Sequence, residues 1–133
     1  MIFLDANVFV DVLSARHGYE ASARIIEYVN EKKEAGCLSA LSVPIIWYVL
    51  GESNESIKDI KALVKHFKII PLNSQMLDIS FASQMDDFED AIQLNSAIKG
   101  GCNTLITRNK KDFGTTKGLD ILTPEEFVAK VKR

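Results

Sequence analysis

The chain has 133 residues, of which 47% are hydrophobic and 26% are charged. This length suits one globular domain, and this composition excludes intrinsically disordered and fibrous proteins, so we expect a single domain over residues 1–133. The 16 Lys and Arg residues against 18 Asp and Glu residues give a formal net charge of −2. That charge excludes the broad cationic surface of a stoichiometric DNA-binding protein.

The chain also lacks the sequence features of membrane and secreted proteins. No apolar run approaches the roughly 20 residues that cross a bilayer, and the acids Asp5 and Asp11 stand where a signal peptide carries basic and then apolar residues. These features predict a cytoplasmic protein without a membrane partner. Two cysteines, Cys37 and Cys102, are too few for a disulfide framework or a four-cysteine zinc site, so we expect reduced thiols in the core.

Hydrophobic periodicity predicts alternating strands and helices along the chain. The expected strands cover residues 2–4, 37–39, 68–72, 104–107 and 121–122. The expected helices cover residues 8–13, 19–34, 42–51, 56–66, 76–83 and 87–99, with Ser42 as a cap, and a last helix opens at Thr123 and Pro124. Four lysines on the helix over residues 56–66 and just after it are interpreted as its solvated side rather than as a phosphate-binding stripe: Lys58, Lys61, Lys65 and Lys68.

This alternation predicts an α/β fold with a mainly parallel sheet that is covered by helices on both faces. In such sheets ligands bind beyond the carboxyl ends of the strands. The rule points to Asp5, which directly follows the first strand, and to the residues after Thr107. A buried carboxylate at Asp5 is costly unless it is paired or bound to a metal ion, although for one aspartate alone helix capping is the commoner explanation.

A second acidic group lies at the start of the helix over residues 87–99. Four carboxylates occur within residues 86–90, and negative charge at a helix N-terminus is favourable by about 0.3–1 kcal/mol per group, which explains some of them. Four like charges also repel one another, and a cation would relieve that repulsion. Asp90 lies deeper in the helix than a cap requires, so we assign it to a pocket.

The segment over residues 107–113 mixes hydroxyl, amide, cationic and carboxylate side chains after the fourth strand. Asn109 or Asp112 can complete a metal site, while three cations can contact phosphate groups: Arg108, Lys110 and Lys111. The alternative is a solvated turn in which Asp112 caps a short helical piece. Oxygen ligands without a His/Cys cluster suit Mg²⁺ or Mn²⁺ rather than zinc, and such ions activate water for phosphodiester hydrolysis. We place His17 and His66 at the surface.

The sequence resembles the PIN-domain family, in the bacterial and archaeal branch that includes toxins of toxin–antitoxin pairs. The resemblance lies in LDANVFVDVL from Leu4, SALS from Ser39, DFEDAIQ from Asp87, LITRNKKDF from Leu105 and LTPEEF from Leu122. It implies a three-layer α/β/α fold with a five-stranded parallel sheet and a metal-dependent endoribonuclease. It also implies RNA as the substrate, and dimers or an antitoxin protein as partners.

Carried over by position, Asp5 matches the first family aspartate and Asp90 the third acid. Two positions depart from the family pattern. The second family acid, usually Glu, falls at Ile45, and the acid two residues after the family threonine falls at Asn109, with Asp112 as the nearest substitute. These departures lower the negative charge of the expected pocket.

Two hypotheses follow from these residues. In the first, Asp5 and Asp90 of a ribonuclease hold Mg²⁺ or Mn²⁺ with help from Asp112 and Asn109. The remaining site residues have assigned roles: Asn7, Asp87 and Thr107 support the ligands, and Arg108, Lys110 and Lys111 guide RNA. In the second, the missing acid at Ile45 leaves a catalytically weak domain that binds RNA or a protein. A phospho-acceptor site is a third reading, which lacks a fitting lysine after the last strands.

Overall fold

A five-stranded parallel sheet forms the centre of the molecule in the computed structural model, which describes residues 1–132. The strands are β1 (Ile2–Leu4), β2 (Gly36–Ser39), β3 (Lys68–Ile70), β4 (Thr104–Ile106) and β5 (Asp120–Leu122). Their order across the sheet is β3-β2-β1-β4-β5, and every neighbouring pair is parallel. The strand order reverses at β1, so the carboxyl ends of β1 and β4 meet at the switch point where ligands bind in such sheets.

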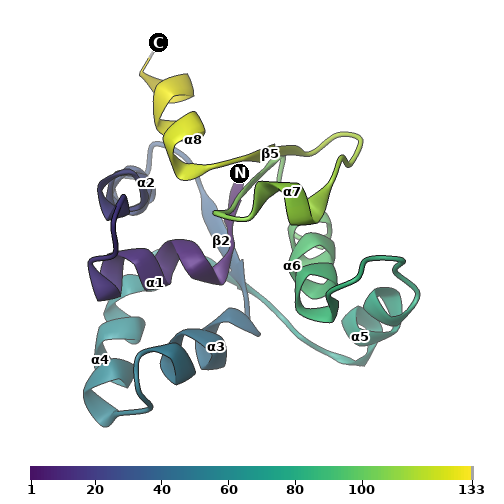
Figure 1. Cartoon of the computed structure of the whole chain (residues 1–133), viewed down its shortest axis with the longest axis horizontal. Coiled ribbons are helices and arrows are strands. Elements are labelled where there is room, and N and C mark those ends of the chain that lie inside the picture. Colours follow the sequence, from purple (N-terminus) through teal and green to yellow (C-terminus); the bar gives the residue numbers. More distant parts are fainter. Residues whose placement is uncertain (133) are drawn as a thin grey trace.

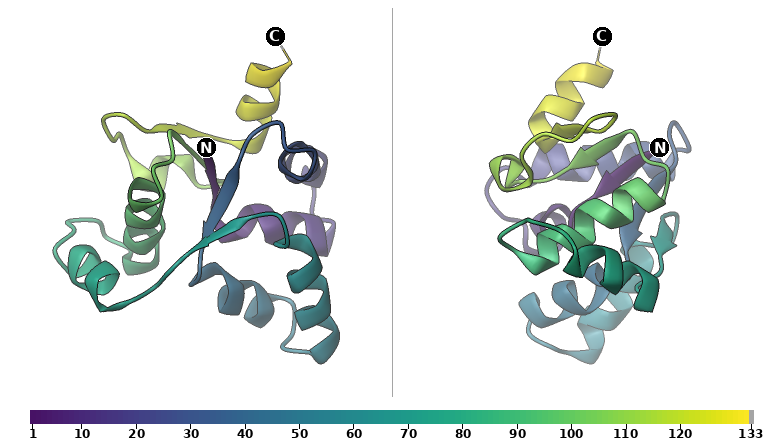
Figure 2. Two further views of the ribbon diagram at one scale, coloured as in Figure 1. Left: turned by 180° about the vertical axis from the view of Figure 1, so that it is seen from behind. Right: turned by 90° about the vertical axis from the view of Figure 1, so that its right-hand side faces the viewer.

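Within residues 1–132, eight helices cover the two faces of this sheet (Figure 1). The helices are α1 (Ala6–Ser14), α2 (Tyr19–Asn30), α3 (Ser42–Val49), α4 (Asn54–Leu63), α5 (Ser74–Phe81), α6 (Phe88–Lys99), α7 (Lys110–Phe113) and α8 (Pro124–Val131). Helices α1, α2, α3, α4 and α8 share one apolar core with the sheet, and α5, α6 and α7 share the other. The views in Figure 2 show the same two groups on either side of the strands.

Successive side chains of β1 pack alternately into the two cores. Ile2 and Leu4 belong to the core under α1 and α2, whereas Phe3 belongs to the core under α6. All three residues are fully buried, as a central parallel strand requires. The predicted three-layer α/β/α fold is therefore confirmed.

Several predicted element ends differ from the structure. The strand expected over residues 68–72 ends at Ile70, before Pro71, and the helix expected over residues 19–34 ends at Asn30. Lys32 has a φ of 60°, a left-handed conformation that cannot continue the helix. The prediction that Ser42 caps α3 is wrong, because Ser42 is the first helical residue and its buried hydroxyl bonds with Gln93 instead.

Other predictions about single residues are confirmed. Thr123 opens α8 in a capping box with Glu126. His17 and His66 are exposed, as are the four lysines at positions 58, 61, 65 and 68. Within residues 1–132, no helix is both long enough and apolar enough to cross a bilayer.

Candidate active site

An acidic hollow of about 270 Å³ opens at the carboxyl ends of β1 and β4. We call it the acid pocket. Six residues singled out from the sequence line it: Asp5, Asn7, Asp87, Asp90, Asn109 and Asp112. Because they come from the ends of β1 and β4 and from the first turn of α6, the fold itself brings these distant segments together.

Asp5 is held from both sides at the floor of the pocket. Its Oδ1 accepts a hydrogen bond of 2.7 Å from the backbone N–H of Ala6, which caps α1, and its Oδ2 accepts one of 2.8 Å from the Thr107 hydroxyl. The side chain is almost completely buried. Burial raises the pKa of Asp5, while the bonds from Thr107 and Ala6 oppose that rise. Asp5 is therefore the N-cap of α1 through Oδ1, and it also lines the acid pocket.

Thr107 connects Asp5 to the segment after β4. Its fully buried hydroxyl donates to Asp5 and accepts hydrogen bonds from the Asn7 amide at 3.5 Å and from the backbone N–H of Asn109 at 3.1 Å. The side-chain oxygen Oδ1 of Asn7 in turn accepts a hydrogen bond of 3.3 Å from the backbone N–H of Arg108. Three side chains therefore fix the β4–α7 turn against the start of α1.

Asp90 is the second acid of the pocket whose pKa is raised. Burial, and then the charges of Asp87, Asp5 and Asp112, raise the pKa of Asp90 to about 6. Asp87 is the N-cap of α6, where its Oδ1 accepts a 3.0 Å hydrogen bond from the backbone N–H of Asp90. Burial first and the neighbouring carboxylates second thus disfavour ionisation of Asp90, and a bound cation would relieve the repulsion among the carboxylates.

The geometry gives Arg108 a task different from the predicted phosphate contact. Its guanidinium donates to Asp11 at 2.5 Å, to Glu125 at 2.6 Å and to the carbonyl oxygen of Gly18 at 2.6 Å, with a further bond to Ser22. Asp11 is buried and also accepts a 3.1 Å bond from Ser22. Arg108 therefore joins α1, α2 and α8 beneath the site, and its donors are not free for RNA.

Replacing Arg108 by alanine should lower the free energy of unfolding by about 3 kcal/mol, because Asp11 would keep a buried charge without a cationic partner. Urea denaturation would measure this loss. Lys110→Ala is the matched control, since Lys110 forms an exposed pair with Glu126 and exposed pairs contribute little. Equal losses in both variants would contradict the anchoring role of Arg108.

The two remaining predicted cations lie beside the acid pocket. Lys110 and Lys111 line a shallow hollow that also includes Asn109, a residue shared with the acid pocket. Lys110 forms an ion pair with Glu126 at 3.0 Å. Lys111 is exposed and forms no ion pair within residues 1–132.

The structure adds residues that the sequence did not single out. Arg16 and Gln93 also line the acid pocket, together with Glu89 from the predicted acidic group. Gln93 follows Asp90 by three residues on the same helix, so helical spacing offered a signal for it. Arg16 lies just after α1, where Ala15 adopts a left-handed conformation with a φ of 47°, and no sequence pattern indicated its position.

Ile45 forms an apolar part of the pocket wall, on α3. Within residues 1–132, no three His, Cys, Asp or Glu side chains lie close enough together to hold a metal ion. The donors that do converge are carboxylate and amide oxygens, which suit a hard cation such as Mg²⁺ or Mn²⁺. Mg²⁺ commonly keeps several waters and takes only one or two carboxylates, so a pair formed by Asp5 and Asp90 fits that chemistry.

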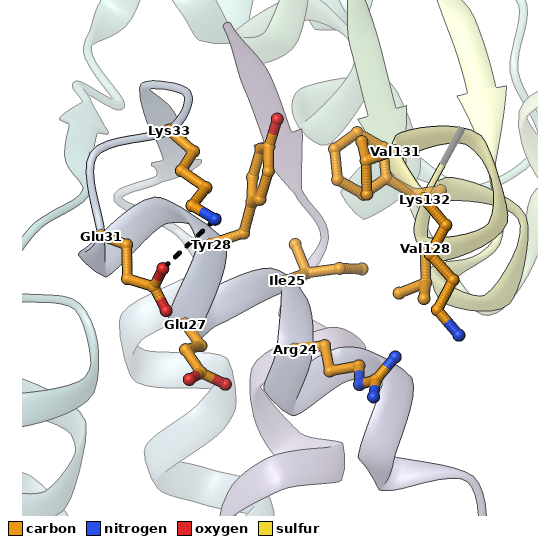
Figure 3. Close-up of a pocket in the computed structure, with 10 residues that line it drawn as sticks. Arg24, Ile25, Glu27, Tyr28, Glu31, Lys33, Val128, Val131 and Lys132 are labelled. Carbon is orange, nitrogen blue, oxygen red and sulfur yellow. Dashed lines mark ion pairs between the residues drawn. The ribbon is translucent and has the colours of Figure 1, made fainter.

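A second hollow, of about 290 Å³, lies between α2 and α8 (Figure 3). Figure 3 shows charged side chains of both signs around Tyr28, and Glu31 pairs with Lys33 at 3.5 Å. The hollow contains only two acids, Glu27 and Glu31, and none of the residues to which the sequence assigned metal or RNA contacts. The acid pocket is therefore the candidate active site.

The comparisons with known proteins agree with this geometry. The sequence profile of the PIN domain matches residues 1–111, which include Asp5, Asp90 and Asn109. The chain belongs to the PIN-domain family. A search of curated protein sequences found no significant match.

Several solved structures have a similar fold across nearly the whole chain. A toxin–antitoxin complex from Klebsiella pneumoniae is 22% identical, with a TM-score of 0.71 over 93% of this chain and 98% of that chain. VapBC2 from Rickettsia felis, bound to a DNA fragment from its promoter, is 17% identical, with a TM-score of 0.67 over 92% and 98%. PAE2754 from Pyrobaculum aerophilum is 15% identical, with a TM-score of 0.65 over 98% and 88%.

Proposed function

We propose that this PIN domain is a divalent-metal-dependent ribonuclease that hydrolyses RNA phosphodiester bonds. The observation that carries the proposal is the convergence of Asp5 and Asp90 in one pocket with Asn109 and Asp112. The raised pKa of Asp90 supports it, because burial and then the charges of neighbouring carboxylates raise it, and a bound cation would offset both effects. Membership of the PIN family supports the reaction class.

Asp5 and Asp90 would hold Mg²⁺ or Mn²⁺, with Asp112 and Asn109 assisting. The bound ion would supply an activated water and neutralise charge on the leaving oxygen. Thr107 keeps Oδ2 of Asp5 oriented through its 2.8 Å hydrogen bond, and Asn7 orients Thr107. Asp87 holds the first turn of α6, so that the carboxylate of Asp90 stays in the pocket.

Cations on two sides of the acid pocket would position the RNA backbone. Arg16 lines one wall and forms no ion pair within the described part of the chain, residues 1–132. Lys111 and Lys110 lie on the other side, beyond Asn109. We assign the phosphate contacts to these three residues, because Arg108 is occupied by Asp11 and Glu125.

We also propose a cytoplasmic protein with an antitoxin-type partner, and homodimers as its assembly. The similar structures from K. pneumoniae and R. felis contain toxin–antitoxin pairs, which supports this class of partner. A neighbouring gene that encodes a small antitoxin-like protein would support the pairing. Its absence would favour a role in housekeeping RNA processing or in binding.

A second function is favoured by one observation. Ile45 occupies the pocket wall where the family pattern has an acid, and the pocket lacks a group of three ligating acids within residues 1–132. A domain with this wall can bind RNA or a protein without cutting RNA. The two functions differ in one measurable outcome, the integrity of the bound RNA.

The test is incubation of the protein with an end-labelled single-stranded RNA in Mn²⁺ buffer. We expect shorter labelled fragments that accumulate with time, and we expect EDTA to stop their formation because it removes the ion. A gel-shift assay on the same samples measures binding. RNA that is bound but remains intact would reject the nuclease and support the binding module.

A further inference from the structure

Two cysteine thiols are in contact within the core. The Sγ atom of Cys37 lies 2.8 Å from that of Cys102, although 65 positions separate them in the sequence. Both are buried free cysteines, and neither lines the acid pocket. The sequence predicted two reduced core thiols but gave no sign that they meet.

The register of the sheet explains the contact. Cys37 is the second residue of β2 and pairs with Phe3, while Cys102 lies two residues before β4, whose Thr104 pairs with Ile2. Both thiols belong to the core that contains Phe3 and lies under α6. A shift of less than about 1 Å would bring the two sulfur atoms to the roughly 2 Å of a covalent bond.

Packing alone accounts for each cysteine separately, because a free cysteine behaves as a small apolar residue. Packing does not require that the two thiols touch each other. Contact between two thiols is the arrangement that allows oxidation to a disulfide, which a pair of alanine or valine residues in the same core would not permit.

We propose that Cys37 and Cys102 form a reversible dithiol–disulfide site that hydrogen peroxide oxidises. Cys102 is 8% exposed and Cys37 is fully buried, so the thiolate of Cys102 reacts first and attacks one peroxide oxygen. This step gives a sulfenic acid and hydroxide. The Cys37 sulfur then attacks the Cys102 sulfur and displaces a second hydroxide.

The two thiol protons convert both hydroxides to water. Two thiols and one peroxide thus become one disulfide and two waters, and a dithiol reductant reverses the change. The hydrogen bond with Cys37 lowers the pKa of Cys102, which agrees with its role as the first nucleophile.

The disulfide would tie β2 to the start of β4 across the central strand. Such a bond restricts the unfolded chain, so the oxidised protein should melt roughly 10 °C above the reduced protein. The bond would form near the amino ends of these strands, whereas the acid pocket lies at the carboxyl ends. Oxidation should therefore leave Mn²⁺ binding unchanged, and the inference does not depend on nuclease activity.

The test uses the full chain, reduced and then treated with hydrogen peroxide. We expect a loss of two hydrogen atoms in the intact mass, no titratable thiol after denaturation, a monomer on a non-reducing gel and the higher melting temperature. Dithiothreitol should restore the original mass, the two titratable thiols and the lower melting temperature, and the protein should remain a monomer. Cys102→Ala and Cys37→Ala are the matched controls, and neither should lose two hydrogens or gain stability.

A second route removes the question of peroxide access to a buried thiol. Reduced, unfolded protein is refolded in a buffer of reduced and oxidised glutathione, and its free thiols are then blocked with iodoacetamide. We expect the intramolecular disulfide here too. If both routes leave two free thiols, or give only overoxidised cysteine or linked dimers, the two residues are ordinary core cysteines.

Discussion

Replacing Asp5 and Asp90 together by asparagine is expected to abolish the stabilisation of the protein by Mn²⁺ and to slow RNA cleavage by about two orders of magnitude or more. A ligand that binds only the folded state stabilises it, and at 100 times its Kd the gain is about 2.7 kcal/mol. For a domain of this size, that gain raises the melting temperature of the wild type by roughly 10 °C. Thermal melts with and without Mn²⁺ measure it.

Without metal, the single substitution Asp90→Asn should raise the free energy of unfolding rather than lower it. The pKa of Asp90 is raised from 3.8 to about 6 in the folded protein, so its ionisation costs folding free energy. This cost is absent below about pH 3.8, grows as the pH rises to about 6, and is complete above that value. Asp90→Asn should therefore stabilise the metal-free protein by about 1 kcal/mol at pH 7, after allowance for solvent screening, and by almost nothing near pH 4.

Asp59 and Asp78 supply the matched control for the double variant, because both are exposed and lie outside the acid pocket. Their replacement by asparagine should change neither the Mn²⁺ effect nor cleavage. An unchanged Mn²⁺ effect in the Asp5/Asp90 variant would place the ion elsewhere. Below about pH 6 the wild-type Mn²⁺ effect should also shrink, since protons then compete for Asp90.

Periodicity in the sequence was enough to predict the alternating strands and helices and hence the parallel sheet. Helix starts were predicted less well. Helices α4 and α5 begin at Asn54 and Ser74, two residues before the predicted starts, because Ser53 and Asn73 cap them through side-chain hydrogen bonds. Such caps are readable from sequence, whereas the left-handed turn at Lys32 depends on how the chain enters β2.

The convergence of Asp5, Asp90 and Asn109 was predictable because parallel strands align their carboxyl ends at one edge of the sheet. The structural role of Arg108 could not be predicted from the sequence. Its neighbours in the sequence made it one cation of a basic run, but its partners Asp11 and Glu125 lie 97 and 17 positions away. Side-chain pairing across elements therefore decided which cations remain free for RNA, and local composition could not reveal it.

The position of Ile45 provides the sharpest test of whether the pocket is built for catalysis. Ile45 is partly buried on α3 and lines the acid pocket with Asp5 and Asp90. Ile45→Glu would place a third carboxylate where the family pattern has one. In Mn²⁺ buffer, we expect cleavage of single-stranded RNA to rise by about an order of magnitude or more, given what one well-placed electrostatic group contributes.

The same substitution should weaken the protein when no metal is present. A carboxylate in a partly buried apolar wall is costly without a partner, and in this pocket it also adds to the repulsion among Asp5, Asp87 and Asp90. Melting in EDTA should therefore show a lower melting temperature than that of the wild type. Mn²⁺ should then raise the melting temperature of the variant by more than it raises that of the wild type.

Ile45→Gln separates charge from shape, because glutamine matches the size of glutamate and carries no charge. It should lose some stability in EDTA, yet show neither the larger Mn²⁺ effect nor the faster cleavage. If the wild type does not cut RNA, and Ile45→Glu neither cuts RNA nor binds Mn²⁺ more tightly than Ile45→Gln, the pocket is not a nuclease site that lacks one acid. The domain would then act by binding, with Ile45 as part of a contact surface rather than a gap in a metal site.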